Sequence, residues 1–185
     1  MRIVFLNYNA FGVGGTVRAT ANLASELSRR GFDVTIMSVR RTSAQPVLPI
    51  ERDVVLEPLV DVRSLPRAPT WRELVRRWPQ RLPSILIHPE EDLYRGYSVV
   101  SDAKLLARIR ALRDCTLITT TPSLNILAAR FAHSSVTTIG QEHKVFEAHG
   151  EALRKEIRKA YRHLDALHCI TEESAARYRQ MLDAA

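Results

Sequence analysis

Glycines gather in one short segment near the N-terminus. Of the seven glycines in the 185-residue chain, three lie within Gly12 to Thr16 (GVGGT). This segment separates an apolar run, Ile3 to Leu6, from a stretch with helical periodicity, Val17 to Arg30. Backbone N–H groups at such a strand-to-helix turn, together with the helix dipole, can bind an anion such as phosphate. The alternative is that the glycines only make a tight turn.

A second polar segment, Gly140 to Lys144 (GQEHK), follows the apolar run Ser135 to Ile139. It is dense in titratable groups, which the core of an α/β domain does not need for packing. A histidine in such a loop can act as an acid, a base or a hydrogen-bond donor near neutral pH. A single loop histidine is also compatible with a structural role, but a position facing the glycine segment favours chemistry for His143.

Other nucleotide and hydrolase motifs are incomplete or absent. No lysine follows Gly15, which excludes a P-loop. A dinucleotide fingerprint requires glycine where Val17 stands and an acidic residue where Arg40 and Arg41 stand, so NAD is disfavoured. An NADP-dependent reductase remains an alternative, because those arginines could bind a 2′-phosphate. No HExxH or GxSxG motif occurs, and no histidine pair has a metal-ligand spacing, so we expect no metal site.

Short apolar runs alternate with helical periodicity along the chain, which predicts an α/β fold: a Rossmann-like, three-layer parallel sheet with helices on both faces. In such sheets, ligands bind at the carboxyl ends of the strands. Thr171 is expected to N-cap the last helix. The predicted strands are residues 3–6, 34–39, 54–56, 115–121, 135–139 and 166–170, and the predicted helices are 17–30, 71–78, 102–112, 123–131 and 151–164.

Positive charge is concentrated in Val62 to Pro83. This segment carries six arginines and one glutamate, or +5 of the formal net charge of +7, together with both tryptophans and four of the nine prolines. Arg67, Arg72, Arg76, Arg77 and Arg81 are interleaved with Trp71 and Trp78. The pattern suits an anionic acceptor or membrane surface better than nucleic acid, and a solvated surface loop is the simplest alternative. A standalone basic module that binds anionic lipid or nucleic acid therefore remains a second hypothesis.

The composition is that of a globular protein, with 45% hydrophobic and 25% charged residues. The N-terminal apolar run is too short for a signal peptide, and no run reaches the roughly 18 apolar residues of a membrane span. Cys115 and Cys169 lie in separate apolar runs, so we expect buried, reduced thiols. We therefore expect a cytoplasmic protein, with peripheral contact to a membrane as an open alternative.

Three segments in matching order resemble the N-terminal domain of GT-B fold, family 4 glycosyltransferases. They are Phe11 to Arg18, Gly140 to His143 and Leu164 to Glu172, whereas Arg40 to Val100 contributes nothing to the resemblance. The resemblance implies a retaining transferase of the hexosyltransferase type. Such enzymes have two Rossmann-like domains and a cleft between them, in which the second domain holds most of a nucleotide-sugar donor.

The resemblance also implies roles for individual residues. Gly14, Gly15 and Thr16 match the loop that approaches the donor diphosphate, and His143 matches a histidine that contacts the transferred sugar. The further candidates, at the acceptor or the cleft, are Asn9, Arg18, Glu142, Thr171 and Glu172. A nucleotide-sugar is the expected co-substrate, with no tightly bound cofactor and no metal requirement.

The expected domain organisation follows from the same resemblance. Residues 1–185 form a single N-terminal, acceptor-side domain, with residues 62–83 as a basic insertion. The donor-binding C-terminal domain is absent from this chain, so we expect the isolated domain to be inactive. The acceptor is unknown, and a membrane surface is one location for it.

Overall fold

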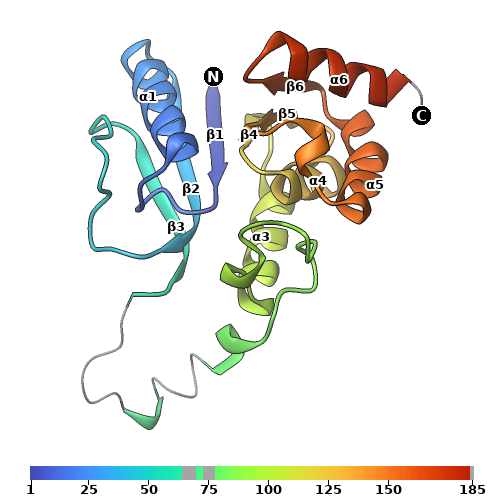
Figure 1. Cartoon of the computed structure of the whole chain (residues 1–185). Coiled ribbons are helices and arrows are strands. Elements are labelled where there is room, and N and C mark those ends of the chain that lie inside the picture. The colour runs from blue at the N-terminus through green and yellow to red at the C-terminus, as the bar shows by residue number, and fades with distance from the viewer. Residues whose placement is uncertain (64–69, 73–77, 184–185) are drawn as a thin grey trace.

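Six parallel strands form one sheet in the computed structural model, in the order β3-β2-β1-β4-β5-β6 (Figure 1). The structure describes residues 1–63, 70–72 and 78–183. The strands are β1 (Arg2–Asn7), β2 (Asp33–Arg41), β3 (Val55–Asp61), β4 (Thr116–Thr119), β5 (Thr137–Glu142) and β6 (Ala166–Cys169). The prediction of an α/β, Rossmann-like parallel sheet is confirmed.

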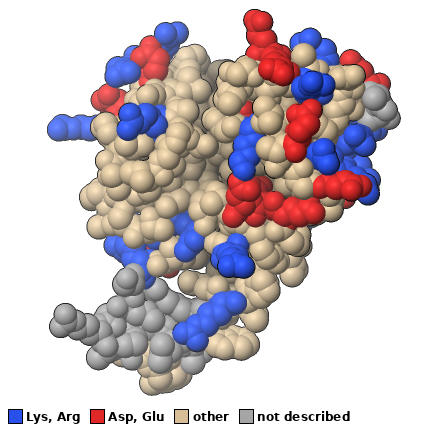
Figure 2. Space-filling view, viewed as in Figure 1, with Lys and Arg blue, Asp and Glu red and all other residues tan. Residues whose placement is uncertain are grey.

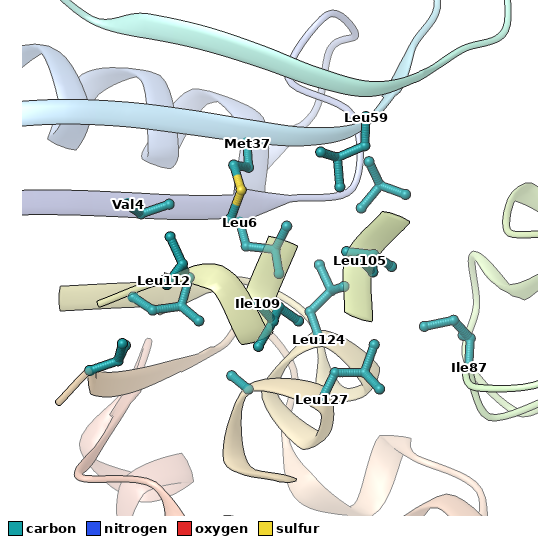
Figure 3. Close-up of a cluster of buried hydrophobic side chains, with 14 of the residues drawn as sticks. Val4, Leu6, Met37, Leu59, Ile87, Leu105, Ile109, Leu112, Leu124 and Leu127 are labelled. Carbon is teal, nitrogen blue, oxygen red and sulfur yellow. The ribbon is translucent and has the colours of Figure 1, made fainter. Parts of the chain in front are cut away.

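Successive residues of β1 face opposite sides of the sheet, and both sides are covered by helices. On one side, Ile3 and Phe5 pack with Ala24 of α1 (Gly15–Arg29). On the other side, Val4 and Leu6 belong to the cluster drawn in Figure 3. That cluster includes residues of α3 (Val99–Ala111) and α4 (Pro122–Phe131), namely Leu105, Ile109, Leu124 and Leu127. The three-layer arrangement follows from this alternation.

A third apolar cluster joins the C-terminal elements to α4. It contains Ile126 of α4 and residues of α5 (Glu151–Ala160), η4 (Tyr161–His163) and α6 (Glu172–Asp183). Tyr178 of α6 lies edge-on to Phe146 in η3 (Phe146–Ala148) and stacked on Tyr161. These contacts fix the chain that follows β5, which carries His143.

Several predicted boundaries were wrong. Gly140 and Glu142 belong to β5, not to a loop, because Gly140 pairs with Thr119 of β4 and Leu167 of β6. The strand predicted to end at residue 121 ends at Thr119, since Thr121 is already the N-cap of α4. The strand predicted at 54–56 extends to Asp61, and the helix predicted at 151–164 ends in the 3₁₀ turn η4.

Three smaller expectations have mixed outcomes. Thr171 does cap α6, since its Oγ1 accepts a hydrogen bond from the Ser174 amide at 3.1 Å. Both cysteines are free, but only Cys115 is buried and Cys169 is half-buried. The helix predicted at 71–78 lies largely outside the described residues, as do Arg67, Arg76 and Arg77. In the described ranges, no helix combines the length and the apolar character needed to cross a membrane.

Candidate functional site

Two adjoining cavities lie at the carboxyl edge of the sheet. The glycine pocket, of about 260 Å³, is lined by residues 7–9, 12–17, 93, 120 and 121. The histidine pocket, of about 200 Å³, is lined by residues 16, 90–93, 120–122, 142–144, 148, 149 and 153. The two share Thr16, Leu93, Thr120 and Thr121. The glycine segment and the His143 segment, far apart in the sequence, therefore meet at one place.

The glycine pocket presents the N-terminus of α1. Gly14 is the N-cap, with φ 156° and ψ 163°, a conformation that non-glycine residues rarely adopt. Its carbonyl accepts the first helical hydrogen bond, from the Arg18 amide at 2.9 Å. Among the described residues, no side chain caps this helix, and its first turn has no acidic residue. The N–H groups of the first turn, which lack helical acceptors, remain available to a ligand.

The lining of the glycine pocket that follows β1 is polar and well fixed. The Asn7 side chain donates to Thr20 Oγ1 at 3.2 Å and accepts from the Asn9 amide at 2.9 Å. Asn9 in turn donates to Thr42 Oγ1 at 3.0 Å. Tyr8 accepts a 2.7 Å hydrogen bond from Arg40. Of the predicted acceptor or cleft residues, Asn9 thus lines a cavity, with its side chain held by a neighbouring loop.

His143 is half-buried in the histidine pocket. Its Nε2 is enclosed and has no hydrogen-bond partner among the described residues. Burial lowers the pKa of His143 below 6.5, the negative charge of Glu142 opposes this shift, and His168 adds to it. The imidazole is therefore neutral at pH 7, and one enclosed ring nitrogen has no partner among the described residues.

Glu142 lies beneath the pocket and faces the protein interior. Its side chain is 1% exposed, and its carboxylate accepts hydrogen bonds from Asn125 Nδ2 at 3.1 Å and from the Tyr161 hydroxyl. The charge of Glu142 contributes, after burial, to a strongly raised pKa of Tyr161. The geometry gives this residue interior partners.

The other predicted cleft residues line neither cavity. Arg18, Thr171 and Glu172 are exposed. Arg40 and Arg41 also point elsewhere, Arg40 to the Tyr8 hydroxyl and Arg41 to the carbonyls of Ser43 and Ala44. Because both arginines have these partners, the structure does not support a 2′-phosphate site, which the NADP-dependent alternative requires.

The loop from His88 to Leu93 is a part of the site that the sequence did not reveal. Glu91 accepts from the Ser123 amide at the start of α4, and Glu90 from the Leu153 amide at the start of α5, both at 2.9 Å. Carboxylates are favourable at helix N-termini. Burial raises the pKa of Glu91, with a smaller contribution from Glu142. The acidic run at 90–92 was the available signal, but it lies in the region without motif resemblance.

Asp92 of the same loop forms an ion pair with Lys144, which neighbours His143. This ion pair joins the loop 88–93 to the segment that carries His143, and both residues line the histidine pocket. Within the described ranges, no three His, Cys, Asp or Glu side chains are grouped as a metal site requires.

Comparison with known proteins identifies the family. Residues 13–184 match the model of Glycosyltransferase Family 4. The chain belongs to glycosyltransferase family 4. The family 4 match also runs through residues 40–100, where no motif was recognised from the sequence. The family resemblance inferred from three segments is therefore confirmed.

A relative of this family 4 chain is an exopolysaccharide phosphotransferase of Streptomyces coelicolor, 30% identical over 178 residues. The alignment covers 94% of this chain and 18% of the relative, so the chain spans less than a fifth of the relative's length. Family and relative together support a glycosyltransferase-like function.

Proposed function

We propose that this chain is the acceptor-side domain of a retaining, nucleotide-sugar-dependent hexosyltransferase of the GT-B type. The observation that carries the proposal is the junction of the glycine and histidine pockets at Thr16, Leu93, Thr120 and Thr121. A donor diphosphate and its sugar are covalently joined, so their binding groups must be neighbours. As the family resemblance implies, a second domain completes the donor site.

The glycine pocket suits the diphosphate. Glycosyl transfer releases a nucleoside diphosphate, and negative charge builds on its leaving oxygen in the transition state. Fixed N–H donors at a helix N-terminus stabilise such charge without a metal ion. The first turn of α1, which begins at Gly15 after the N-cap Gly14 and has no side-chain cap among the described residues, supplies these donors.

The histidine pocket suits the transferred sugar. A neutral imidazole can donate one hydrogen bond and accept another, which matches sugar hydroxyl groups. His143 lines this pocket, and its enclosed Nε2 has no partner in the described structure, so a small rotation of the ring would let it bond a sugar hydroxyl. In this proposal His143 positions the sugar and forms no covalent bond with it.

The released nucleotide tests the reaction class. The protein encoded by the complete reading frame is incubated with a panel of nucleoside diphosphate sugars and candidate acceptors. Glycosyl transfer releases a nucleoside diphosphate, whereas transfer of a sugar phosphate releases a nucleoside monophosphate. The proposal expects the diphosphate. Release of only the monophosphate would favour a phosphotransferase, the activity in the relative's name, and would contradict the proposal.

A second proposal concerns where the acceptor lies. Trp71, Trp78 and Ile85 are 69%, 60% and 80% exposed, although large apolar side chains usually avoid water. Arg72 stacks over Trp71, and Figure 2 shows basic side chains beside the grey segment at the lower end of the molecule. The β1 arrow in Figure 1 points to this same end. Interfacial tryptophan with arginine favours an anionic membrane surface as the location of the acceptor.

A further inference from the structure

A buried carboxylate beneath the histidine pocket has no full cation beside it. Among the described residues, the only ion-pair partner of Glu142 is His149, whose Nε2 lies 3.5 Å from Glu142 Oε2. Glu142 is 1% exposed and His149 is 7% exposed. Burying a charge without a strong partner costs free energy, and a glutamine of the same shape would fill the same space. Packing alone therefore does not explain an acid at this position.

The partners of this carboxylate are held in fixed orientations. Asn125 accepts from Thr119 Oγ1 at 2.6 Å, which fixes its amide so that Nδ2 donates to Glu142. The Tyr161 hydroxyl also donates to Glu142 Oε1. Glu142 Oε2 lies 3.5 Å from His149 Nε2, and the Tyr178 hydroxyl, which also interacts with the Glu142 carboxylate, lies 3.0 Å from the same nitrogen. Only a protonated Nε2 can face a carboxylate without repulsion between lone pairs.

The same contact closes the loop that carries His143. Residues 143–148 begin directly after Glu142 and end directly before His149, so the Glu142 and His149 side chains join the two ends of the loop. His143, Lys144 and Ala148 of this loop line the histidine pocket, and His149 lines it as well. This buried contact therefore holds together the two ends of the segment that carries His143.

We infer that Glu142 is a positioning residue, whose charge fixes the Nε2–H tautomer of His149 and anchors the loop that presents His143 to the histidine pocket. The role rests on the proposed function, in which His143 contacts the transferred sugar. The inference adds His149 to the site, which the sequence motifs did not do. Glu142 then acts indirectly, through His149 and the segment that carries His143.

Glu142→Gln tests this role because it removes the charge and keeps the shape. The matched control is Asp102→Asn, which alters another buried carboxylate, one that accepts from Ser84 Oγ and the amides of Ile85 and Leu86 away from both pockets. ¹⁵N shifts of the His149 ring are measured in the labelled chain. We expect a single Nε2–H form in the wild type and in Asp102→Asn, and loss of that single form in Glu142→Gln. An unchanged His149 signal in a folded Glu142→Gln protein would overturn the inference.

Kinetics supply the second readout, in the protein from the complete reading frame. Glu142→Gln is expected to lower kcat about tenfold or more and to leave KM for the donor within about twofold, since misplaced catalytic groups act on the reaction step. An equal loss of kcat in Asp102→Asn would reduce the role of Glu142 to stability alone and would also overturn the inference.

Two further outcomes must be distinguished: a Glu142→Gln variant that does not fold, and a wild type without activity. If Glu142→Gln does not fold, Tyr178→Phe removes the other group next to His149 Nε2 and leaves Glu142 in place. The Nε2–H form is then expected to persist, and its loss would show that Tyr178 fixes the tautomer and would overturn the inference. If the wild type turns over no nucleotide-sugar, the proposed function fails, while the ring signals still decide whether Glu142 fixes His149.

Discussion

Gly14 and His143 are the two residues on which the account of the site depends most. Gly14 starts α1 in a conformation reserved for glycine, and His143 carries a neutral ring with an enclosed nitrogen. One residue acts through its backbone and the other through its side chain. Their properties can be tested separately.

Substitution of Gly14 should destabilise the chain through backbone strain. Gly14→Ala places a Cβ at φ 156°, and such strain costs about 1–3 kcal/mol. Gly15→Ala is the matched control, because no atom lies within 4 Å of the added Cβ and the position is helical. Denaturant unfolding should show a loss for Gly14→Ala and little change for Gly15→Ala. Equal stability of the two variants would contradict the observed turn.

The lowered pKa of His143 predicts how stability depends on pH. The unfolded imidazole binds a proton near pH 6.5, whereas burial makes the folded one bind it only at lower pH. The unfolded state then binds more protons in this range, so stability falls as pH drops below 6.5 and recovers above it. Unfolding curves at about pH 7.5 and pH 5.5 should show a smaller difference for His143→Gln than for the wild type. An identical difference would exclude His143 as the source.

At the scale of elements, β5 decides how the site is assembled. Gly140 lies where β5 passes α4, and a Cβ there would approach Leu164 Cδ1 to 2.9 Å and Asn125 Cγ to 3.1 Å. Asn125 holds Glu142, so the close approach at Gly140 also supports the floor of the histidine pocket.

Gly140→Ala should therefore destabilise the chain by about 1–3 kcal/mol, the usual cost of overpacking. Thermal unfolding measures the effect, and the ¹⁵N signal of the Asn125 side chain reports whether that amide has moved. A variant as stable as the wild type, with Asn125 unmoved, would show that the neighbours yield without cost.

The periodicity of the sequence was sufficient to predict the parallel sheet and the meeting of the two motif loops. Boundaries were less predictable where polar residues sit inside elements. The sequence predicts Glu142 as a loop residue, because its hydrogen-bond partners Asn125 and Tyr161 are distant in sequence. The loop 88–93 was missed for the same reason. Its Glu90 and Glu91 carboxylates accept hydrogen bonds from amides at the N-termini of α5 and α4, which are distant in sequence and become neighbours only in the fold.

At the scale of the whole molecule, the feature that stands out is the position of the basic segment, residues 62–83. The net charge of +7 is largely that of residues 62–83, and the described part of that segment lies toward the end of the molecule to which β1 points (Figure 1). The basic segment thus lies toward the end at which β1 terminates, and the last residue of β1, Asn7, lines the glycine pocket.

Vesicle binding tests the proposed membrane contact. The chain should co-sediment with vesicles that contain anionic phosphatidylglycerol and not with phosphatidylcholine alone, and added salt should weaken binding. Arg72→Gln with Arg81→Gln should reduce binding more than the control pair Arg158→Gln with Arg162→Gln, which changes the same charge on exposed residues elsewhere. Equal effects of the two pairs would indicate attraction by net charge only.

The central claim is that His143 and the glycine loop form one site for glycosyl transfer. Its most direct test is nucleoside diphosphate release from a nucleotide-sugar by the protein from the complete reading frame, compared among wild type, His143→Ala and His163→Ala. His163 is exposed and lines neither pocket. The account predicts a loss of about 100-fold or more for His143→Ala and wild-type rates for His163→Ala, with both variants folded. Wild-type turnover by folded His143→Ala would contradict it.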